Sequence, residues 1–313
     1  MTSISDLDIF ARVARTGNMS AAGREMGLSP AVISKRVSLL EESLGARLFQ
    51  RTTRHLTLTE TGEGYFKRVV DILNLVEEAE DFVHRRSTLP RGQLKITAPT
   101  AFGRLHIAPH LRSFFDQFPD IQLNFLITDD TFDIIRDGVD LAIRIGELDD
   151  SSLVAKKLAA NTRVICAAPK YLEDFGTPQS LRELQEHNCL AVGKQDLWRV
   201  SGPDGVHNFR PSGCMRSNSA EFSKQAIVAG LGVGLRSTWD IGPELKNGTL
   251  KIVLPQYRGS VNDAIFAVYP SREFMPSKVN AFIDFLCELY GAEPYWEKGI
   301  DLSNLARIGS SAA

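Results

Sequence analysis

Apolar residues recur at helical spacing in the first part of the chain, in segments that end at glycines. The first segment predicts a helix that Asp6 caps and Gly17 ends. A second, shorter helix is expected over residues 21–26, with Ser20 as its cap. Gly27 then permits a sharp turn, because glycine enters the left-handed region without steric cost. The pattern therefore predicts a pair of helices and a turn that leads into a third.

Ser29 and Pro30 mark the start of this third helix, since a hydroxyl suits the cap and proline suits the first helical position. We expect the helix from Ala31 to about Leu44, where Gly45 stops it. One of its stripes is apolar and should be buried: Ile33, Val37, Leu40 and Leu44. Another is small and polar with one long cation: Ala31, Ser34, Lys35 and Ser38. Such a stripe suits entry into a DNA major groove, because it permits close approach and offers donors to bases and phosphates.

Two short apolar strands, at residues 48–51 and 56–58, flank a polar and basic turn. This pattern predicts a wing on which Arg51 and Arg54 contact phosphates or an adjacent minor groove. A short helix pair with a glycine turn is also common in all-α proteins, and an arginine at a hairpin tip is usually only solvated. The combination of a capped helix, a separable polar face and a basic hairpin favours DNA binding.

Charge is distributed unevenly along the chain. Residues 1–68 contain ten basic and seven acidic residues and so carry a net charge of +3, whereas the whole chain carries −2 and the remainder therefore −5. Cationic surface concentrated at one end is what a DNA-binding head on an otherwise neutral or acidic body needs.

These N-terminal residues resemble the winged helix-turn-helix head of LysR-type transcriptional regulators. The matching motifs are Leu40-Glu41, Leu44-Gly45, Leu48-Phe49-Gln50-Arg51 and Leu58-Thr59-Glu60-Thr61-Gly62. One departure is Ser34-Lys35-Arg36-Val37, where many members have Ser-Arg-Gln-Ile; lysine offers a point charge in place of a two-pronged donor. The candidate DNA-binding residues are Ser20, Pro30, Ala31, Ser34, Lys35, Arg51 and Arg54.

A heptad pattern follows the wing. Thr59 caps a helix whose apolar residues alternate at spacings of four and three, namely Tyr65, Val69, Ile72, Val76, Ala79 and Val83. An ordinary amphipathic helix packed on its own domain gives the same pattern. However, residues 88–92 contain a proline and a glycine that end the helix, so it joins two domains and has little of its own chain to pack against. We therefore expect it to pair with a second copy in a dimer or tetramer, which doubles the DNA-reading heads.

From Gln93 onward, predicted strands alternate with predicted helices, which indicates mostly parallel sheets covered on both faces. The expected strands are residues 94–98, 121–127, 141–145, 163–168, 189–192, 232–235, 250–253 and 264–268. The expected helices are residues 102–118, 133–137, 181–186, 220–229 and 277–289.

Ligands of such sheets bind beyond the carboxyl ends of the strands, often over helix N-termini. Helix starts at Thr100 and Ser219 would suit a carboxylate, although each also fits a plain helix cap. The resemblance to LysR-type regulators extends here and implies two subdomains like those of periplasmic solute-binding proteins, crossed twice by the chain, with an effector between them. It implies that Thr100, Thr128, Gly146 and Ser219 lie near the effector. Residues 140–146, 166–172 and 229–235 are most similar to the subgroup around the regulators of malate use and of neisserial contact.

The predicted fold class is α+β multidomain: a winged helix-turn-helix, a long linker helix and two α/β subdomains of periplasmic-binding-protein type. The expected boundaries are 1–62 for the head, 63–90 for the linker helix, 91–162 with 266–292 for subdomain I, 163–265 for subdomain II and 293–313 for a C-terminal tail.

Several other kinds of protein fit the sequence poorly. Polar residues interrupt any N-terminal signal peptide, and no apolar run is long enough to cross a membrane, so a cytoplasmic protein is expected. The four cysteines are isolated, which favours reduced thiols over a redox sensor. His106 and His110 could hold a metal but lack the glutamate of a zinc protease motif, and Gly230-Leu231-Gly232-Val233-Gly234 follows a helix, unlike a dinucleotide loop. We expect no enzyme activity, no cofactor and no metal.

The sequence thus predicts a regulator that binds specific DNA under the control of a small-molecule effector, such as a small carboxylate or other anion. Its expected partners are double-stranded promoter DNA, the effector, further copies of itself and, for an activator, RNA polymerase. Two alternatives remain open at this point. One is a cytosolic small-molecule-binding α/β protein whose head mediates protein contacts, and the other is a regulator that needs no ligand.

Overall fold

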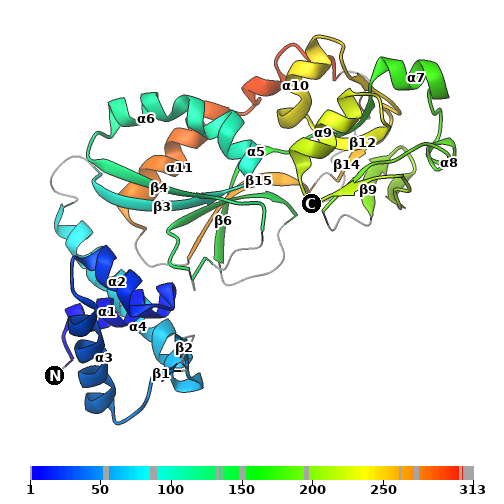
Figure 1. The fold of residues 1–313 in the computed structure, drawn as a ribbon. Coiled ribbons are helices and arrows are strands. Elements are labelled where there is room, and N and C mark those ends of the chain that lie inside the picture. Colours follow the sequence, from blue (N-terminus) through cyan, green and yellow to red (C-terminus); the bar gives the residue numbers. More distant parts are fainter. Residues whose placement is uncertain are drawn as a thin grey trace.

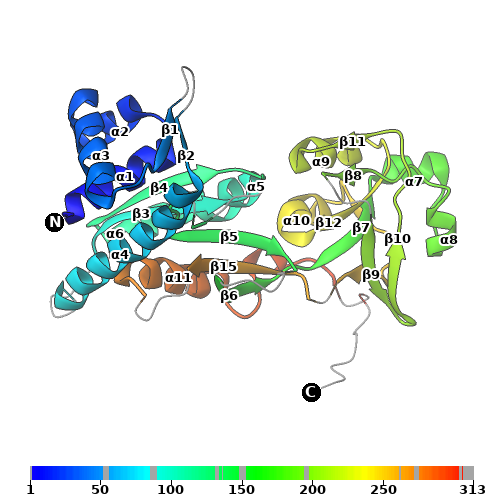
Figure 2. The same ribbon diagram turned by 90° about the horizontal axis from the view of Figure 1, so that it is seen from below.

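A computed structural model describes residues 2–51, 56–84, 90–130, 134–135, 137–147, 153–193, 197–260, 262–270, 275–302 and 305. A small N-terminal head leads into one long helix and then into a body of two α/β subdomains (Figure 1). Figure 2 shows the head beside the first subdomain, with the second subdomain at the far end of the body.

The head contains three helices and a two-stranded wing. The helices are α1 (Ile4–Thr16), α2 (Met19–Met26) and α3 (Pro30–Leu44), and the wing pairs β1 (Phe49–Arg51) with β2 (Leu56–Leu58) in antiparallel fashion. Each helix ends at a glycine in the left-handed region, with φ of 59° at Gly17, 65° at Gly27 and 63° at Gly45, as predicted.

The caps of the first two helices differ from the prediction. Ser3 caps α1 by accepting a hydrogen bond from the Asp6 N–H, while the Asp6 carboxylate accepts one from the Ser3 N–H. Asn18 caps α2, because its Oδ1 accepts from the N–H groups of Ser20 and Ala21 at 2.8 and 3.0 Å. The predictions that Asp6 and Ser20 are caps were therefore wrong; both lie in the first turn of their helices.

The two stripes of α3 separate largely as expected. Ile33, Val37 and Leu40 are buried against α1 and the wing. Leu44, predicted to join them, is 39% exposed, because the last turn of α3 extends past the core of the head. The end of α3 is instead fastened through Glu41, whose carboxylate accepts the N–H groups of Leu48 and Phe49 at 2.7 and 3.0 Å.

The long helix α4 spans Glu60–His84, and the Thr59 hydroxyl oxygen accepts the Gly62 N–H at its start. Val69 is fully buried in the core of its own head, so the prediction of an unbroken dimer seam from Tyr65 onward was wrong there. Further along α4, Ile72 and Leu75 are 41% and 59% exposed. The first turns of α4 thus belong to the head, and apolar surface is exposed only beyond them.

The first subdomain is built on a five-stranded sheet with the order β4-β3-β5-β15-β6. Its strands are β3 (Gly92–Ala98), β4 (Ile121–Ile127), β5 (Leu141–Gly146), β6 (Leu153–Ala160) and β15 (Ala264–Pro270). β3 is parallel to β4 and β5, whereas β15 is antiparallel to β5 and β6. Helices α6 (Leu111–Gln117) and α11 (Ser277–Tyr290) pack on this sheet through Phe114 and Phe282 (Figure 1).

The segment predicted as one helix over 102–118 is broken into pieces. α5 (Thr100–Phe102) continues into a π-helical turn (Gly103–Ile107), a 3-10 turn (Ala108–His110) and α6. Pro109 explains the break, because proline has no N–H to donate within a helix and its ring clashes with the preceding turn. The helix predicted over 133–137 is also absent from the described residues, of which Ile134, Ile135 and Asp137 lie in turns.

The second subdomain has a six-stranded sheet with the order β10-β9-β14-β7-β12, in which β13 also pairs with β7. Its strands are β7 (Arg163–Ala167), β9 (Trp198–Gly202), β10 (Gly205–Phe209), β12 (Val233–Ser237), β13 (Lys251–Ile252) and β14 (Arg258–Gly259). All these pairs are antiparallel, so the prediction of a mostly parallel sheet was wrong here. The reason is the β9–β10 hairpin and the direct pairing of β7 with strands far along the chain.

The remaining elements of the second subdomain surround this sheet. They are α7 (Pro169–Phe175), α8 (Leu181–Leu184), α9 (Ala220–Val228), α10 (Thr238–Lys246) and the short parallel pair β8 (Ala191–Val192) and β11 (Arg216–Ser217). The pattern predicted α8 and α9, but not α7 or α10. Neither β6 nor the β9–β10 hairpin was predicted.

The chain crosses between the subdomains twice, from β6 to β7 and from β14 to β15. The two crossings lie side by side, because the Asn161 N–H donates to the Asp263 carbonyl at 3.2 Å and the Asn161 amide donates to the Asp263 carboxylate at 2.8 Å. A double crossing is the arrangement that the resemblance implied.

We predict that Glu41→Ala lowers the free energy of unfolding of the head by about 1–3 kcal/mol, because two buried N–H groups lose a charged acceptor. The thermal transition of the head in the full chain should fall by several degrees. Glu42→Ala, which removes the exposed carboxylate one residue along, is the matched control and should leave the transition in place. Equal effects of the two substitutions would contradict this account of the α3 end.

Candidate DNA interface and effector cleft

The N-terminal half of α3 presents one polar face to solvent. Pro30, Ala31 and Lys35 are exposed on it and Ser34 is half-buried. Ser20 is exposed in the first turn of α2, the helix before the turn. The structure therefore gathers four of the candidate DNA-binding residues on one helix face and places the fifth on the neighbouring helix.

Arg36, next to Lys35 in sequence, serves the head itself. Its guanidinium lies 3.1 Å from the Asp6 carboxylate and donates to the Ser5 hydroxyl at 2.9 Å. The Ser3 hydroxyl lowers the pKa of Asp6 by hydrogen bonding, and Arg36 adds to this lowering. Arg36 thus clamps α3 to the start of α1, and Lys35 is the cation on the exposed polar face.

The wing places Arg51 at the end of β1. The side chain of Arg51 and the whole of Arg54 lie outside the described residues, so their predicted contacts with DNA stay a prediction. The backbone pairing of Arg51 with Leu56 does show that the two strands of the wing pair where the sequence indicated.

A cavity of about 180 Å³ lies between the two subdomains. It is lined by Ile145, Gly146, Asn161, Arg163, Val192, Ala220, Leu235, Arg236, Ser237, Trp239, Asp240 and Asp263. Of the predicted effector residues, Gly146 lines this cavity and Ser219 immediately precedes Ala220, which also lines it. Thr100 and Thr128 are not among its lining residues.

The polar groups of three predicted effector residues already have partners. The Thr100 N–H donates to the Asp129 carboxylate at 2.8 Å, so a negative charge occupies the place expected for an effector anion. The Ser219 hydroxyl accepts the Phe222 N–H at 3.2 Å as an ordinary helix cap. The Thr128 hydroxyl accepts the Asp130 N–H at 3.2 Å within a turn.

Charged residues that the sequence analysis did not single out dominate the cavity. The guanidinium of Arg236 pairs closely with Asp240, four residues along the chain. Arg163 lies 3.7 Å from Asp263, and burial raises the pKa of Asp263 while Asn161 and Arg163 oppose this shift. The sequence did contain a signal for these residues: Arg163 and Arg236 lie within apolar strands, and arginine is rarely buried unless it is paired.

A third ion pair joins the two subdomains directly. Arg104, in the π-helical turn of the first subdomain, lies 2.7 Å from Glu221 at the start of α9 in the second. Both side chains are about half-exposed, so the pair adds little to the stability of the fold and acts mainly on the relative orientation of the two subdomains.

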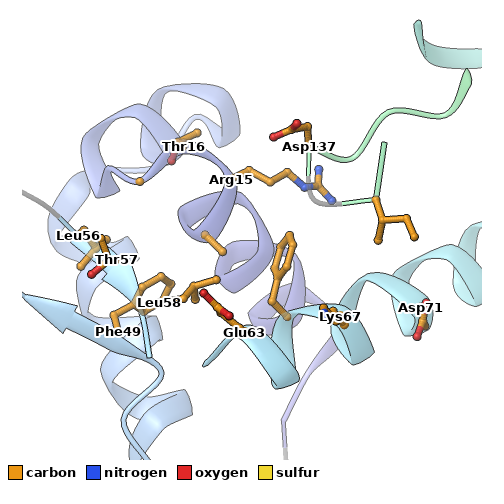
Figure 3. Close-up of a pocket in the computed structure, with 14 residues that line it drawn as sticks. Arg15, Thr16, Phe49, Leu56, Thr57, Leu58, Glu63, Lys67, Asp71 and Asp137 are labelled. Atoms are coloured by element: carbon orange, nitrogen blue, oxygen red, sulfur yellow. The ribbon is translucent and has the colours of Figure 1, made fainter. Parts of the chain in front are cut away.

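A larger cavity, of about 870 Å³, separates the head from the first subdomain. Figure 3 shows Arg15, at the end of α1, directed towards the body loop that carries Asp137. The guanidinium lies against Gly138 so closely that a Cβ there would be 2.7 Å from its central carbon. The head and body therefore touch through this arginine, and none of the predicted effector residues lines the cavity.

His106, one of the two histidines that could hold a metal, has hydrogen-bond partners within the protein. His106 is buried, which lowers its pKa, and both its ring nitrogens are within hydrogen-bond distance of partners. Among the described residues, no group of three or more histidine, cysteine or acidic side chains could hold a metal ion. No helix among the residues that the structure describes is long and apolar enough to cross a membrane.

Comparison with known proteins identifies the family. The model for the bacterial regulatory helix-turn-helix protein of the lysR family matches residues 4–63, and the model for the LysR substrate binding domain matches residues 87–290. The chain therefore belongs to the LysR family of transcriptional regulators. The resemblance seen in the sequence, the predicted fold class and the prediction of a DNA-binding regulator in place of an enzyme are confirmed.

Relatives match over nearly the whole chain. The HTH-type transcriptional regulator DmlR of Escherichia coli is 36% identical over 296 residues, which cover 93% of this chain and 95% of DmlR. The HTH-type transcriptional activator TtdR of Escherichia coli is 35% identical and covers 90% of this chain and 91% of its own. Among solved structures, CrgA of Neisseria meningitidis, a LysR-type transcriptional regulator, is 31% identical with a TM-score of 0.57, covering 92% of this chain and 99% of its own.

We predict that thiol reagents distinguish the four cysteines. Burial raises the pKa of Cys166 and of Cys189 to about 12, so at pH 8 only about one in ten thousand of either is the reactive thiolate. Cys214 is exposed and should react first, followed by the half-buried Cys287. Mass spectrometry after brief alkylation checks this order. Rapid modification of Cys166 in the folded protein would contradict it and revive the redox-sensor alternative.

Proposed function

We propose that this protein is a cytoplasmic, oligomeric regulator that binds promoter DNA through α3 and its wing, and whose DNA binding changes when a small anion binds between its subdomains. The observation that carries the proposal is the exposed polar face of α3 beside a wing, on a chain whose body encloses a charged cavity. In this proposal the head contacts DNA, and binding of the anion in the cavity changes the affinity of the head for DNA.

In this proposal Ser34 and Lys35 contact base edges or phosphates in the major groove, with Pro30 and Ala31 permitting close approach. Arg51 and Arg54 hold the DNA backbone beside the groove. A second copy pairs along the exposed residues of α4, Ile72 and Leu75, so that two heads engage two half-sites.

The effector proposed for the cleft is a small carboxylate or similar anion that pairs with Arg163. A volume of about 180 Å³ suits a compact metabolite, and 18% exposure leaves Arg163 within reach of a ligand. Binding there would alter the orientation of the subdomains and, through them, the spacing of the heads. For an activator, the altered complex would engage RNA polymerase.

The proposed division of the chain follows the crossings. The head and α4 precede residue 91, subdomain I joins 91–162 to 266–292, and subdomain II is the segment 163–265 between the crossings. The first turns of α4 pack in the core of the head, which argues that the head extends past residue 62.

We expect Lys35→Ala and Arg51→Ala both to weaken DNA binding, by about tenfold or more, since each removes a cation that contacts DNA. The Arg51→Ala loss should be similar on all DNA sequences, whereas the Lys35→Ala loss should depend on the base. Gel-shift titration against a promoter fragment recovered by genome-wide mapping of bound DNA measures both, and affinity should fall steeply with salt.

Arg112→Ala is the control, because this exposed arginine lies on α6, away from the head. It should leave DNA affinity unchanged. Wild-type affinity in both head variants would overturn the assignment of the interface, and salt-independent binding would favour a head that contacts proteins.

We also expect a small carboxylate that binds the cleft to raise the thermal midpoint of the body, because at a hundredfold excess over Kd it stabilises the folded state by about 2.7 kcal/mol. Arg163→Gln should abolish this rise, because the proposed anion loses its charged partner. Arg112→Gln, an exposed arginine on the first subdomain, should keep it. A carboxylate that stabilises Arg163→Gln as much as wild type would place the anion elsewhere.

A further inference from the structure

The chain continues beyond the last residue that the family model matches. That match ends at residue 290, where α11 also ends, yet residues 291–302 and 305 are described and run from α11 to α10 (Figure 1). The sequence analysis assigned this region no function. Its contacts reach both subdomains at four places.

The first contact is with the core of subdomain I. Trp296 is only 4% exposed and lies in an aromatic cluster, with ring centroids 4.7 Å from His106, 5.1 Å from Tyr290 and 6.1 Å from Phe102. Burying an aromatic side chain of this size provides much of the anchoring energy of a segment whose described residues form no strand.

The second contact is a chain of hydrogen bonds through Tyr295. The Nε2 of His106 lies 2.9 Å from the Trp239 carbonyl, which can only accept, so Nε2 carries the proton. In the neutral ring Nδ1 then accepts from the Tyr295 hydroxyl at 2.7 Å. Burial lowers the pKa of His106, which favours this neutral form. His110 Nε2 lies 3.1 Å from the same hydroxyl and donates to it.

This hydrogen-bond chain joins the two subdomains. His106 lies in the π-helical turn of subdomain I, whereas Trp239 lies on α10, directly after β12 of subdomain II. Tyr295 therefore supports a contact across the subdomain boundary.

The third contact is with α10 itself. The Thr238 hydroxyl, which is fully buried, donates to the Glu297 carboxylate at 2.6 Å. Gly242 faces the Trp296 carbonyl so closely that a Cβ would lie 3.1 Å from its oxygen. A glycine in α10 is thus what lets the segment lie directly on the helix.

The fourth contact is with the core of subdomain II. Leu302 and Leu305 pack in the apolar cluster that contains Ile241 and Leu245 of α10 and Val164 of β7. The segment thus begins in one core and reaches the other.

The helix that these contacts hold also lines the cleft. Trp239 and Asp240 of α10 line the cavity between the subdomains, while Thr238 and Gly242 of the same helix contact the C-terminal segment. The position of the segment therefore fixes where two cavity-lining side chains lie.

We propose that residues 291–302 and Leu305 form a C-terminal strap, a third segment of the chain that joins the subdomains in addition to the two crossings. The strap sets their angle and holds α10 against the cleft. Tyr295 and Glu297 are its positioning residues: they touch no ligand and act through His106, Thr238 and α10. Two adjacent crossings permit hinge rotation, and a further segment that contacts both subdomains restricts it. The strap thus limits how far the cleft opens.

The test measures the distance between the subdomains in the full-length protein. Nitroxide labels are attached to native Cys214 in subdomain II and to Arg112→Cys in subdomain I, with Cys287→Ser to prevent a third label. Electron dipolar spectroscopy gives the distance distribution. Combining Tyr295→Phe with Glu297→Ala should broaden that distribution by about twofold or more, because the subdomains gain hinge freedom.

Two control variants separate positioning from general stability. Tyr257→Phe removes a tyrosine hydroxyl in subdomain II, away from the strap, and should leave the distribution at its wild-type width. Val200→Ala opens a hole in the core of subdomain II, so it should lower the melting temperature without broadening the distribution.

The proposal is overturned if the double variant keeps the wild-type width, or if Val200→Ala broadens the distribution as much as the double variant does. The measurement uses neither DNA nor an effector. Its outcome is therefore independent of whether the proposed DNA interface and effector are correct.

Discussion

The body of this regulator depends on the polar contact between its two crossings. Asp263 is only 8% exposed, and its carboxylate is held by the Asn161 amide and the Arg163 guanidinium. Burying a carboxylate is costly unless it is paired and hydrogen-bonded, so these three side chains constrain one another's positions. Because all three also line the cavity, the same contact that joins the subdomains forms one wall of the cleft.

The head was predictable from the sequence because its structure is mostly local. The Ser29-Pro30 start of α3, its glycine stop and its buried stripe up to Leu40 all follow from residues a few positions apart. Errors of the prediction arose where a non-local contact intervened. Val69 has the spacing of a dimer seam, yet it packs on the head, because the fold brings α1 against the first turns of α4.

The cleft was less predictable, because its chemistry comes from partners that meet only in the folded chain. Asp129 reaches the Thr100 N–H from 29 residues away and supplies the negative charge expected from a ligand. Arg163 meets Asp263 across a hundred positions, a pairing that no short motif encodes. Antiparallel pairing in the second sheet was missed for the same reason, since β7 pairs with strands from much later in the chain.

The adjacent cations Lys35 and Arg36 have different surroundings and different roles. Arg36 fastens α3 to α1 through Asp6 and Ser5, whereas Lys35 stands on the exposed polar face. In the proposed interface, substitution at position 35 therefore alters the surface offered to DNA and removes no contact of Arg36 that holds the fold, whereas substitution at position 36 removes that contact. If DNA is read as proposed, a single mutation at position 35 can change the preferred operator sequence while the head stays folded.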